Sequence, residues 1–227
     1  MTFYRYKLIN RGLDELQNTY FAMWVDPDLG CSDDDYVGCD VGRSLAYTYN
    51  EDILDGTTGC DCSNGANTYC DQVPIIGTDY FRGPLAPKIQ VAEGVGELRV
   101  VTNADQWKPA SKYTVGDSIW VRDVNIGEQT EPDIQVELGM SSFAYYNRSD
   151  LAPNPQTGDP TVAPQFYNYM RGLWLDGTPF TFGGSGFNPG STDSVRYAFP
   201  GNPNDNNSWS MCTEDEPFGD RRTVQAS

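Results

Sequence analysis

Aspartates crowd one short segment of this chain, and their mutual repulsion constrains its folding more than any other feature. Six of them fall within residues 26–40: Asp26, Asp28, Asp33, Asp34, Asp35 and Asp40. Like charges at this density repel one another unless a counter-charge neutralises them. Ca²⁺ takes about 6–8 oxygen ligands, which aspartates on a turning loop can supply. The segment therefore predicts a calcium site, and the alternative is a solvated acidic turn, because Asp and Gly are ordinary turn residues.

The spacing of these aspartates indicates an irregular metal-binding loop. Asp26 and Asp28 are two residues apart, so on an extended strand end they point the same way. We expect the other side of the ion to be closed by Asp34, Asp35 and Asp40. An EF-hand is excluded, because that motif needs Asp or Asn at position five and Glu at position twelve. Counted from Asp26, these positions hold Gly30 and Val37.

Charge and composition exclude several functions. The chain has 32 acidic and 15 basic residues, a net charge of −17 and no histidine. Nucleic acid is an unsuitable partner, because binding phosphates requires a basic surface. Catalysis by Ser-His-Asp or Cys-His groups is impossible, whereas paired carboxylates leave glycoside hydrolysis open. No apolar stretch approaches the roughly 20 residues that cross a bilayer, so we expect no membrane insertion.

Six cysteines predict disulfides in an oxidising compartment: Cys31, Cys39, Cys60, Cys62, Cys70 and Cys212. Six cysteines allow 15 pairings, so sequence alone leaves the connectivity open. Short separations favour Cys31 with Cys39 and Cys62 with Cys70, which leaves Cys60 with Cys212. A zinc site is the alternative, but Cys60 and Cys62 are closer together than zinc-binding cysteine pairs usually are.

Hydrophobic periodicity predicts a mainly β fold. Strand-like runs occur at residues 2–10, 18–25, 43–49, 73–85 and 138–147, and residues 220–227 resemble a further strand. Residues 164–175 form the one convincing helix pattern. We expect a sandwich or jelly-roll-like fold with long loops and at most one or two short helices. The single domain would span residues 1–227, with a small β insertion at 86–137 that contains strand-like runs at 97–101 and 118–124.

Two further features predict ligand binding less directly. Asn50, Glu51, Asp52 and Asp55 form a second acidic cluster, and residues 202–206 form another oxygen-rich loop. A plain solvated turn is the favoured interpretation of both. Most tryptophans are expected in the core, because aromatic rings bury large areas in β domains. Trp209 lies in a polar run and is the best candidate for an exposed ring that contacts a glycan.

Several stretches resemble a segment of very large secreted surface proteins of Bacteroidota. The principal ones are residues 24–30 (WVDPDLG), 34–40 (DDYVGCD) and 43–50 (RSLAYTYN). Shorter similar stretches lie at 77–84, 176–181, 197–201 and 219–222, and 86–137 is the part that the resemblance does not cover. Such proteins typically end in a type IX secretion sorting domain, which this sequence lacks. The resemblance implies a fragment of a larger exported protein with surface display and an adhesion-like role.

Together these features predict a calcium-stabilised structural or adhesive module of a secreted bacterial surface protein. The alternative is a carbohydrate-binding module, and a polysaccharide-degrading enzyme or a subunit of an extracellular filament are further possibilities. An enzymatic role is not favoured. The expected partners are an extracellular glycan, another surface protein or a second copy of the chain.

Overall fold

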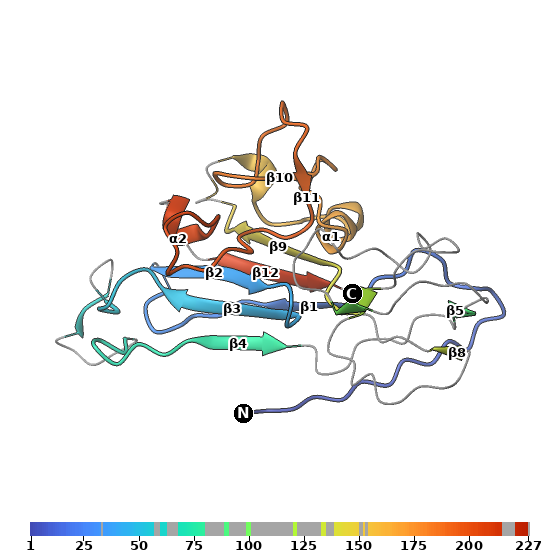
Figure 1. The fold of residues 1–227 in the computed structure, drawn as a ribbon, viewed down its shortest axis with the longest axis horizontal. Helices are drawn as coiled ribbons and strands as arrows, with labels where there is room; N and C mark the ends of the chain where they lie inside the picture. The colour runs from blue at the N-terminus through green and yellow to red at the C-terminus, as the bar shows by residue number, and fades with distance from the viewer. Residues whose placement is uncertain are drawn as a thin grey trace.

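The computed structural model describes residues 1–32, 34–56, 60–62, 68–79, 139–149, 152, 154–214 and 221–226. It also describes the backbone of four two-residue strands between residues 89 and 134. Strands predominate and the two α-helices are short, which confirms the mainly β fold class (Figure 1).

Two antiparallel three-stranded sheets form the centre of the molecule. The first, here called the β12 sheet, has the order β1 (Ala22–Val25), β12 (Arg221–Ala226), β9 (Ser142–Asn147). The second, the β3 sheet, has the order β2 (Asp35–Asp40), β3 (Leu45–Asn50), β4 (Ile76–Asp79). Tyr36 pairs with Tyr49 across β2 and β3, and Val224 lies between Trp24 and Ala144 in the β12 sheet.

The two sheets pack against each other as a small sandwich. Thr223 of β12 and Thr48 of β3 line one small cavity between them. The side chain of Gln225 donates a hydrogen bond to the carbonyl of Ser44. The hydroxyl of Ser44 accepts a second hydrogen bond, from Met140 N. These bonds satisfy polar groups that are buried between the layers.

Residues 196–199 join the sheets along one side of the sandwich. Phe143 of β9 donates to the carbonyl of Arg196 at 3.0 Å and accepts from Ala198 N at 2.9 Å. Cys39 of β2 donates to the carbonyl of Phe199 at 3.2 Å. The β9 and β2 edges are therefore closed by one short segment, whereas the opposite edges are β1 and β4.

Helix α1 (Ala163–Met170) covers the outer face of the β12 sheet. Tyr169 of the helix stacks on Tyr146 of β9 with ring centroids 4.9 Å apart. The helix ends at Met170, two residues before Gly172, whose φ is +70°. Leu173 N donates to the carbonyl of Asn168 at 2.9 Å. Glycine in this conformation is a usual helix terminator, which is why the helix is shorter than the predicted 164–175.

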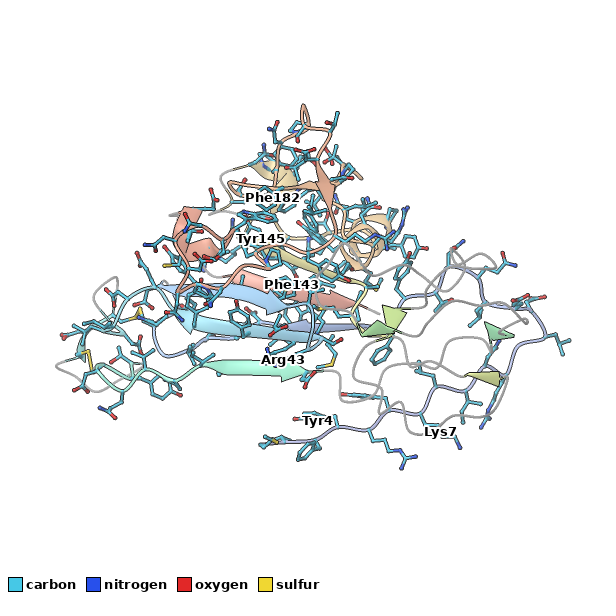
Figure 2. All side chains as sticks on the ribbon, viewed as in Figure 1. Tyr4, Lys7, Arg43, Phe143, Tyr145 and Phe182 are labelled. Atoms are coloured by element: carbon cyan, nitrogen blue, oxygen red, sulfur yellow. A yellow bond between two sulfur atoms is a disulfide. The ribbon has the colours of Figure 1, made fainter. Side chains whose placement is uncertain are left out.

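An aromatic core lies between the sheets and the C-terminal elements. Trp174 is fully buried and makes edge contacts to the rings of Tyr145, Tyr169, Phe180 and Phe187. Its indole N–H donates to the carbonyl of Gly186 at 2.9 Å. Figure 2 shows Tyr145 and Phe143 among these packed side chains. The elements around this core are the 3-10 turn at Pro155–Thr157, the strand pair β10 (Phe180–Thr181) and β11 (Ser194–Val195), and α2 (Met211–Glu214).

The segment 86–137 lies outside the described residues apart from two pairs of short strands. β5 (Ile89–Gln90) pairs with β8 (Asp133–Ile134), and β6 (Arg99–Val100) pairs in parallel with β7 (Trp120–Val121). β6 and β7 fall within the runs predicted at 97–101 and 118–124. Whether this segment is an insertion stays a prediction.

Two sequence predictions fail for physical reasons. Residues 2–10 alternate like a strand, yet none of them is part of a described strand, because the alternation of side chains alone does not supply a neighbouring strand. Residues 35–40 were expected in an acidic loop, yet they form the buried strand β2. Tyr36, Val37 and Cys39 pack into the core, and this burial outweighs the turn preference of the flanking aspartates.

Candidate metal centre

The acidic segment consists of a loop and the strand β2 that follows it. Leu29, Cys31, Asp34 and Asp35 are all buried, with exposed fractions of 2% or less. Buried carboxylates are costly unless a counter-charge or hydrogen bonds compensate them. The environment of each therefore decides what the segment can bind.

Asp34 has one carboxylate oxygen in a hydrogen bond and one without a hydrogen-bond partner. Its Oδ2 accepts from Gly56 N at 3.2 Å, and its backbone carbonyl accepts from Glu51 N at 2.8 Å. Its Oδ1 is fully buried and accepts no hydrogen bond from the described residues. Such an oxygen loses its hydration without replacement, which destabilises the folded state unless something else binds it.

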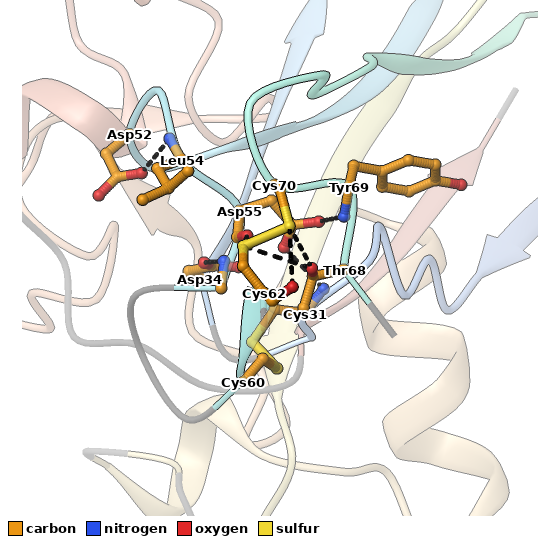
Figure 3. Close-up of a disulfide and its surroundings, with 11 residues drawn as sticks. Cys31, Asp34, Asp52, Leu54, Asp55, Cys60, Cys62, Thr68, Tyr69 and Cys70 are labelled. Atoms are coloured by element: carbon orange, nitrogen blue, oxygen red, sulfur yellow. Dashed lines mark hydrogen bonds between the residues drawn. A yellow bond between two sulfur atoms is a disulfide. The ribbon is translucent and has the colours of Figure 1, made fainter. Parts of the chain in front are cut away.

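Asp55 lies beside Asp34 although it is 21 positions further along the chain. Its Oδ1 accepts from Cys31 N at 2.9 Å and its Oδ2 accepts from Tyr69 N. Its own N–H donates to the carbonyl of Cys70 at 2.9 Å. Carboxylate oxygens of Asp34 and Asp55 and the sulfur of Cys31 all lie within 4.8 Å of one another (Figure 3).

Asp35 adds a third buried carboxyl group next to this pair. Its Oδ2 accepts from Leu29 N at 2.8 Å. Burial raises the pKa of Asp35 to about 8, and the charges of Asp34, Asp55 and Asp28 contribute to the same shift. Burial also raises the pKa of Asp34, with Asp55 and Asp52 adding to it, although the hydrogen bond from Gly56 opposes the shift.

Two disulfides hold the segments that carry these carboxylates. Cys31 is bonded to Cys60 and Cys62 to Cys70, and Figure 3 shows both bridges around Asp55. The Cys62–Cys70 pairing is confirmed. The predicted pairings of Cys31 with Cys39 and of Cys60 with Cys212 are wrong.

The error in pairing follows from the strand that the sequence did not reveal. Cys39 lies near the end of β2 and its thiol donates to the carbonyl of Ala198 at 3.4 Å inside the core. Cys31 lies in the loop before β2, so the strand separates the two cysteines. Cys212 is exposed on α2 and its backbone N–H donates to the hydroxyl of Tyr49. Neither Cys39 nor Cys212 is part of a disulfide.

The Cys31–Asp34–Asp55 group can hold a metal ion. Because Cys31 is in a disulfide, its sulfur is not the thiolate that zinc prefers. The ligands of suitable charge are then carboxylate oxygens, which suit a hard cation. Asn50 adds another buried side-chain oxygen without a hydrogen-bond partner among the described residues, and it pairs with Asp35 across β2 and β3.

The other predicted metal ligands lie apart from this group. Asp26 and Asp28 are exposed, although Asp28 is close enough for its charge to act on Asp35. Asp40 is at the far end of β2, where it forms a salt bridge with Arg43. It is five steps along the strand from Asp35, a distance of about 16 Å. Asp33 lies outside the described residues.

Asp55 is the candidate ligand that sequence reasoning missed, because its cluster was interpreted as a solvated turn. One signal was available: Asp55 precedes Cys60 and Cys62 by five and seven positions, in a long loop of the kind that is often functional. The contact itself depends on pairing between distant segments. Residues 202–208 do form a turn, in which Asn202 Oδ1 accepts from Asn204 N and Asp205 Oδ1 from Asn207 N.

Trp209 is wrong as a glycan-contacting residue, because it is 3% exposed. Its ring packs on Phe182 and Phe199, and its indole N–H donates to the carbonyl of Gly184 at 3.0 Å. A ring buried in this way offers no face to a sugar.

Comparisons with known proteins leave the family prediction untested. The chain matches no protein-family model, no curated protein and no solved structure. No helix among the described residues has the length and apolar character to cross a membrane. The two disulfides indicate an oxidising, non-cytoplasmic compartment.

Proposed function

We propose that this chain is a calcium-stabilised structural or adhesive module of a secreted bacterial surface protein. The observation that carries the proposal is the buried Oδ1 of Asp34, which has no hydrogen-bond partner among the described residues and lies in a group of carboxylates. A bound cation would replace the hydration that this oxygen loses. It would also offset the repulsion among Asp34, Asp35 and Asp55.

Calcium is the cation that best suits these ligands and this compartment. Ca²⁺ accepts irregular arrangements of carboxylate, amide and backbone oxygens, whereas Mg²⁺ requires a nearly ideal octahedron. Disulfide-bonded proteins occupy oxidising compartments such as the cell exterior. Extracellular calcium modules bind with dissociation constants of about 10⁻⁴–10⁻³ M, which is sufficient for a structural ion.

The ion would act on stability, because the site exists only when distant segments have folded together. Asp34 precedes β2, and Asp55 lies in the disulfide-bonded segment after β3. Binding to the folded state alone stabilises it by about 2.7 kcal/mol when the free ion is at a hundred times its dissociation constant. The ion would thus stabilise the contact between the disulfide-bonded segment that contains Asp55 and the loop before β2 that contains Asp34.

The test is thermal unfolding of the whole chain in EDTA, in millimolar Ca²⁺ and in millimolar Mg²⁺. We expect Ca²⁺ to raise the melting temperature by several degrees and Mg²⁺ to have a smaller effect. Asp34→Asn keeps the shape of the side chain but removes its charge, so it should abolish most of the calcium response. Asp193→Asn, at an exposed position, is the matched control and should respond like the unmodified chain.

An equal calcium response in the unmodified chain and in Asp34→Asn would contradict the site. Isothermal titration with Ca²⁺ then distinguishes a different site from the absence of binding. The surface location rests on the resemblance to secreted Bacteroidota proteins and on the disulfides. Protease accessibility of the native protein on intact cells tests it separately.

A further inference from the structure

The metal centre and the Cys31–Cys60 disulfide belong to one closed ring of the chain. Asp34 lies between Cys31 and strand β2, and Asp55 lies between strand β3 and Cys60. The pairing of β2 with β3 closes the ring at one end, and the disulfide closes it at the other. The two candidate ligands are therefore on the two arms of this ring, and the bridge joins the arms at the end away from the strands.

Hydrogen bonds also join the two arms near the bridge. Cys31 N donates to Oδ1 of Asp55 at 2.9 Å, and Gly56 N donates to Oδ2 of Asp34 at 3.2 Å. Each arm thus donates to the carboxylate of the other arm, and Figure 3 shows Asp34 and Asp55 beside the bridge. Because Cys31 is half of the disulfide, opening the bridge also releases the donor of one of these two bonds.

The second disulfide holds Asp55 within its own segment. Asp55 N donates to the carbonyl of Cys70 at 2.9 Å, and Tyr69 N donates to Oδ2 of Asp55. The sulfur of Cys62 lies 3.1 Å from the carbonyl oxygen of Asp55. The Cys62–Cys70 bridge therefore positions Asp55 relative to residues 60–70, whereas the Cys31–Cys60 bridge joins that segment to the arm that carries Asp34.

The separation of the arms determines whether one ion can contact both carboxylates. Oxygens of Asp34 and Asp55 and the sulfur of Cys31 lie within 4.8 Å of one another. Asp34 Oδ1 is buried and accepts no hydrogen bond from the described residues. Calcium–oxygen distances are about 2.3–2.6 Å. A separation of the arms by a few ångströms more would thus remove one of the two ligands from the ion.

We propose that formation of the Cys31–Cys60 disulfide switches on calcium binding at this centre. With the bridge closed, Asp34 and Asp55 share one ion. With the bridge open, repulsion between the two carboxylates separates the arms and the affinity for calcium falls. This inference rests on the proposed calcium function and adds a redox condition to it. The chain would then bind its structural ion in an oxidising compartment and lose it on reduction.

The redox step is a thiol–disulfide exchange with a dithiol reductant. A thiolate of the reductant attacks one sulfur of the bridge, the S–S bond breaks, and the other cysteine leaves as a thiolate that takes up a proton. The second thiol of the reductant then displaces the first cysteine. The protein gains two electrons and two protons, and the reductant becomes a disulfide. Linkage is reciprocal, so calcium must favour the closed bridge by the same factor by which the bridge favours calcium binding.

The first experiment compares calcium affinity, by isothermal titration, in the unmodified chain and in Cys31→Ala/Cys60→Ala. Alanine is chosen because serine would place a new oxygen near the ion. Cys212→Ala is the matched control, since Cys212 is exposed and is not part of a disulfide. We expect the bridge variant to bind Ca²⁺ more weakly by about 10-fold or more and the control to bind like the unmodified chain. Circular dichroism establishes that both variants are folded.

The second experiment does not depend on the folding of the bridge variant. The unmodified chain is equilibrated with mixtures of reduced and oxidised dithiothreitol, in EDTA or in saturating Ca²⁺. Thiol alkylation and mass spectrometry then measure how much of the Cys31–Cys60 bridge remains. Ca²⁺ should raise the ratio of reduced to oxidised dithiothreitol at half-reduction by about 10-fold or more. In Asp34→Asn, which lacks the charge of one ligand, Ca²⁺ should leave this ratio nearly unchanged.

Equal calcium affinity in the unmodified chain and in a folded bridge variant overturns the proposal. A reduction equilibrium of the unmodified chain that Ca²⁺ does not shift also overturns it. Both outcomes leave the calcium function standing, because the unmodified chain still binds the ion. A shift of equal size in Asp34→Asn overturns the proposal by placing the ion elsewhere. An oxidised, unmodified chain that binds no Ca²⁺ overturns this proposal and the calcium function together.

Discussion

Gly30 shows how closely the loop before β2 is fitted to the carboxylate of Asp55. Its φ is +77°, and a Cβ added there would overlap Oδ2 of Asp55 and lie 2.9 Å from the ring of Tyr69. The backbone N–H of the next residue, Cys31, donates to the same carboxylate. A side chain at position 30 would therefore displace Asp55 as well as strain the backbone.

Gly30→Ala should destabilise the fold by about 2–4 kcal/mol, of which about 1–2 kcal/mol is the cost of positive φ. Gly183→Ala is the matched control, because Gly183 has a φ of +88° and no atom within 4 Å of its added Cβ. Urea unfolding of both variants separates backbone strain from contact with Asp55. Only Gly30→Ala should also weaken the response to Ca²⁺, and equal losses in the two variants would contradict the close fit.

At the scale of the element, β2 begins inside the carboxylate cluster and passes through the core before it ends at the partly exposed Asp40. Asp35 is the first residue of the strand. Near its end, Cys39 donates hydrogen bonds from its thiol to the carbonyl of Ala198 and from its backbone N–H to the carbonyl of Phe199. The protonation of Asp35 is thus coupled to the pairing of β2 with β3. Since the folded state raises the pKa of Asp35 to about 8, the folded chain without metal holds a proton that the unfolded chain releases above about pH 4.

The free energy of unfolding in EDTA should therefore fall as pH rises from about 4 to about 8. The stabilisation that protonated Asp35 contributes is complete below about pH 4 and is lost as the pH rises to about 8. One proton corresponds to at most about 1.4 kcal/mol per pH unit. In Ca²⁺ the decline should be smaller, because the ion binds the ionised carboxylates and its affinity rises with pH. Urea unfolding across this range measures both slopes.

Asp35→Asn provides the comparison for this pH dependence, since an amide does not titrate. Its slope in EDTA should be flatter than that of the unmodified chain. Asp193→Asn should leave the slope unchanged, because that residue is exposed. Identical slopes in all three proteins would show that Asp35 does not titrate in this interval.

For the whole molecule, stability depends on a core of aromatic rings drawn from distant parts of the chain. Trp174 contacts β9, α1 and β10 at once through Tyr145, Tyr169 and Phe180. Aromatic pairs in such edge-to-face arrangements contribute about 0.5–1.5 kcal/mol beyond the area they bury. The core thus connects the β12 sheet to the C-terminal elements.

Trp174→Ala should cost about 3–5 kcal/mol, because it leaves a large cavity and removes the donor to the carbonyl of Gly186. Trp24→Ala is the control, because Trp24 is 52% exposed and its indole N–H donates to the hydroxyl of Tyr146. That change should cost about 1 kcal/mol. Urea unfolding of both variants measures the difference in their free energies of unfolding. Similar losses of stability in the two variants would contradict a central role for Trp174.

Local patterns predicted the parts of this fold that depend on local information. β3, β9 and α1 lie within or close to predicted runs, since alternation and helical spacing are properties of adjacent residues. β2 was missed because Asp35 and Asp40, at its ends, have the composition of a turn. Asp34 lies beside Asp55, which was not predicted as a ligand, because sequence spacing does not reveal which distant segments meet. The same reason explains the wrong cysteine pairings.

The position of β12 has a consequence for the order in which the chain can fold. It is the middle strand of its sheet, and the Thr223 hydroxyl meets the carbonyl of Val25, 198 residues earlier in the sequence. Ribosomal synthesis begins at the N-terminus, so β1 and β9 are made before β12. The two strands lack the strand that lies between them until residues 221–226 have been made. Sheets that close such long loops form slowly. The β12 sheet therefore stays incomplete until residues 221–226 are available, however early β1 has been made.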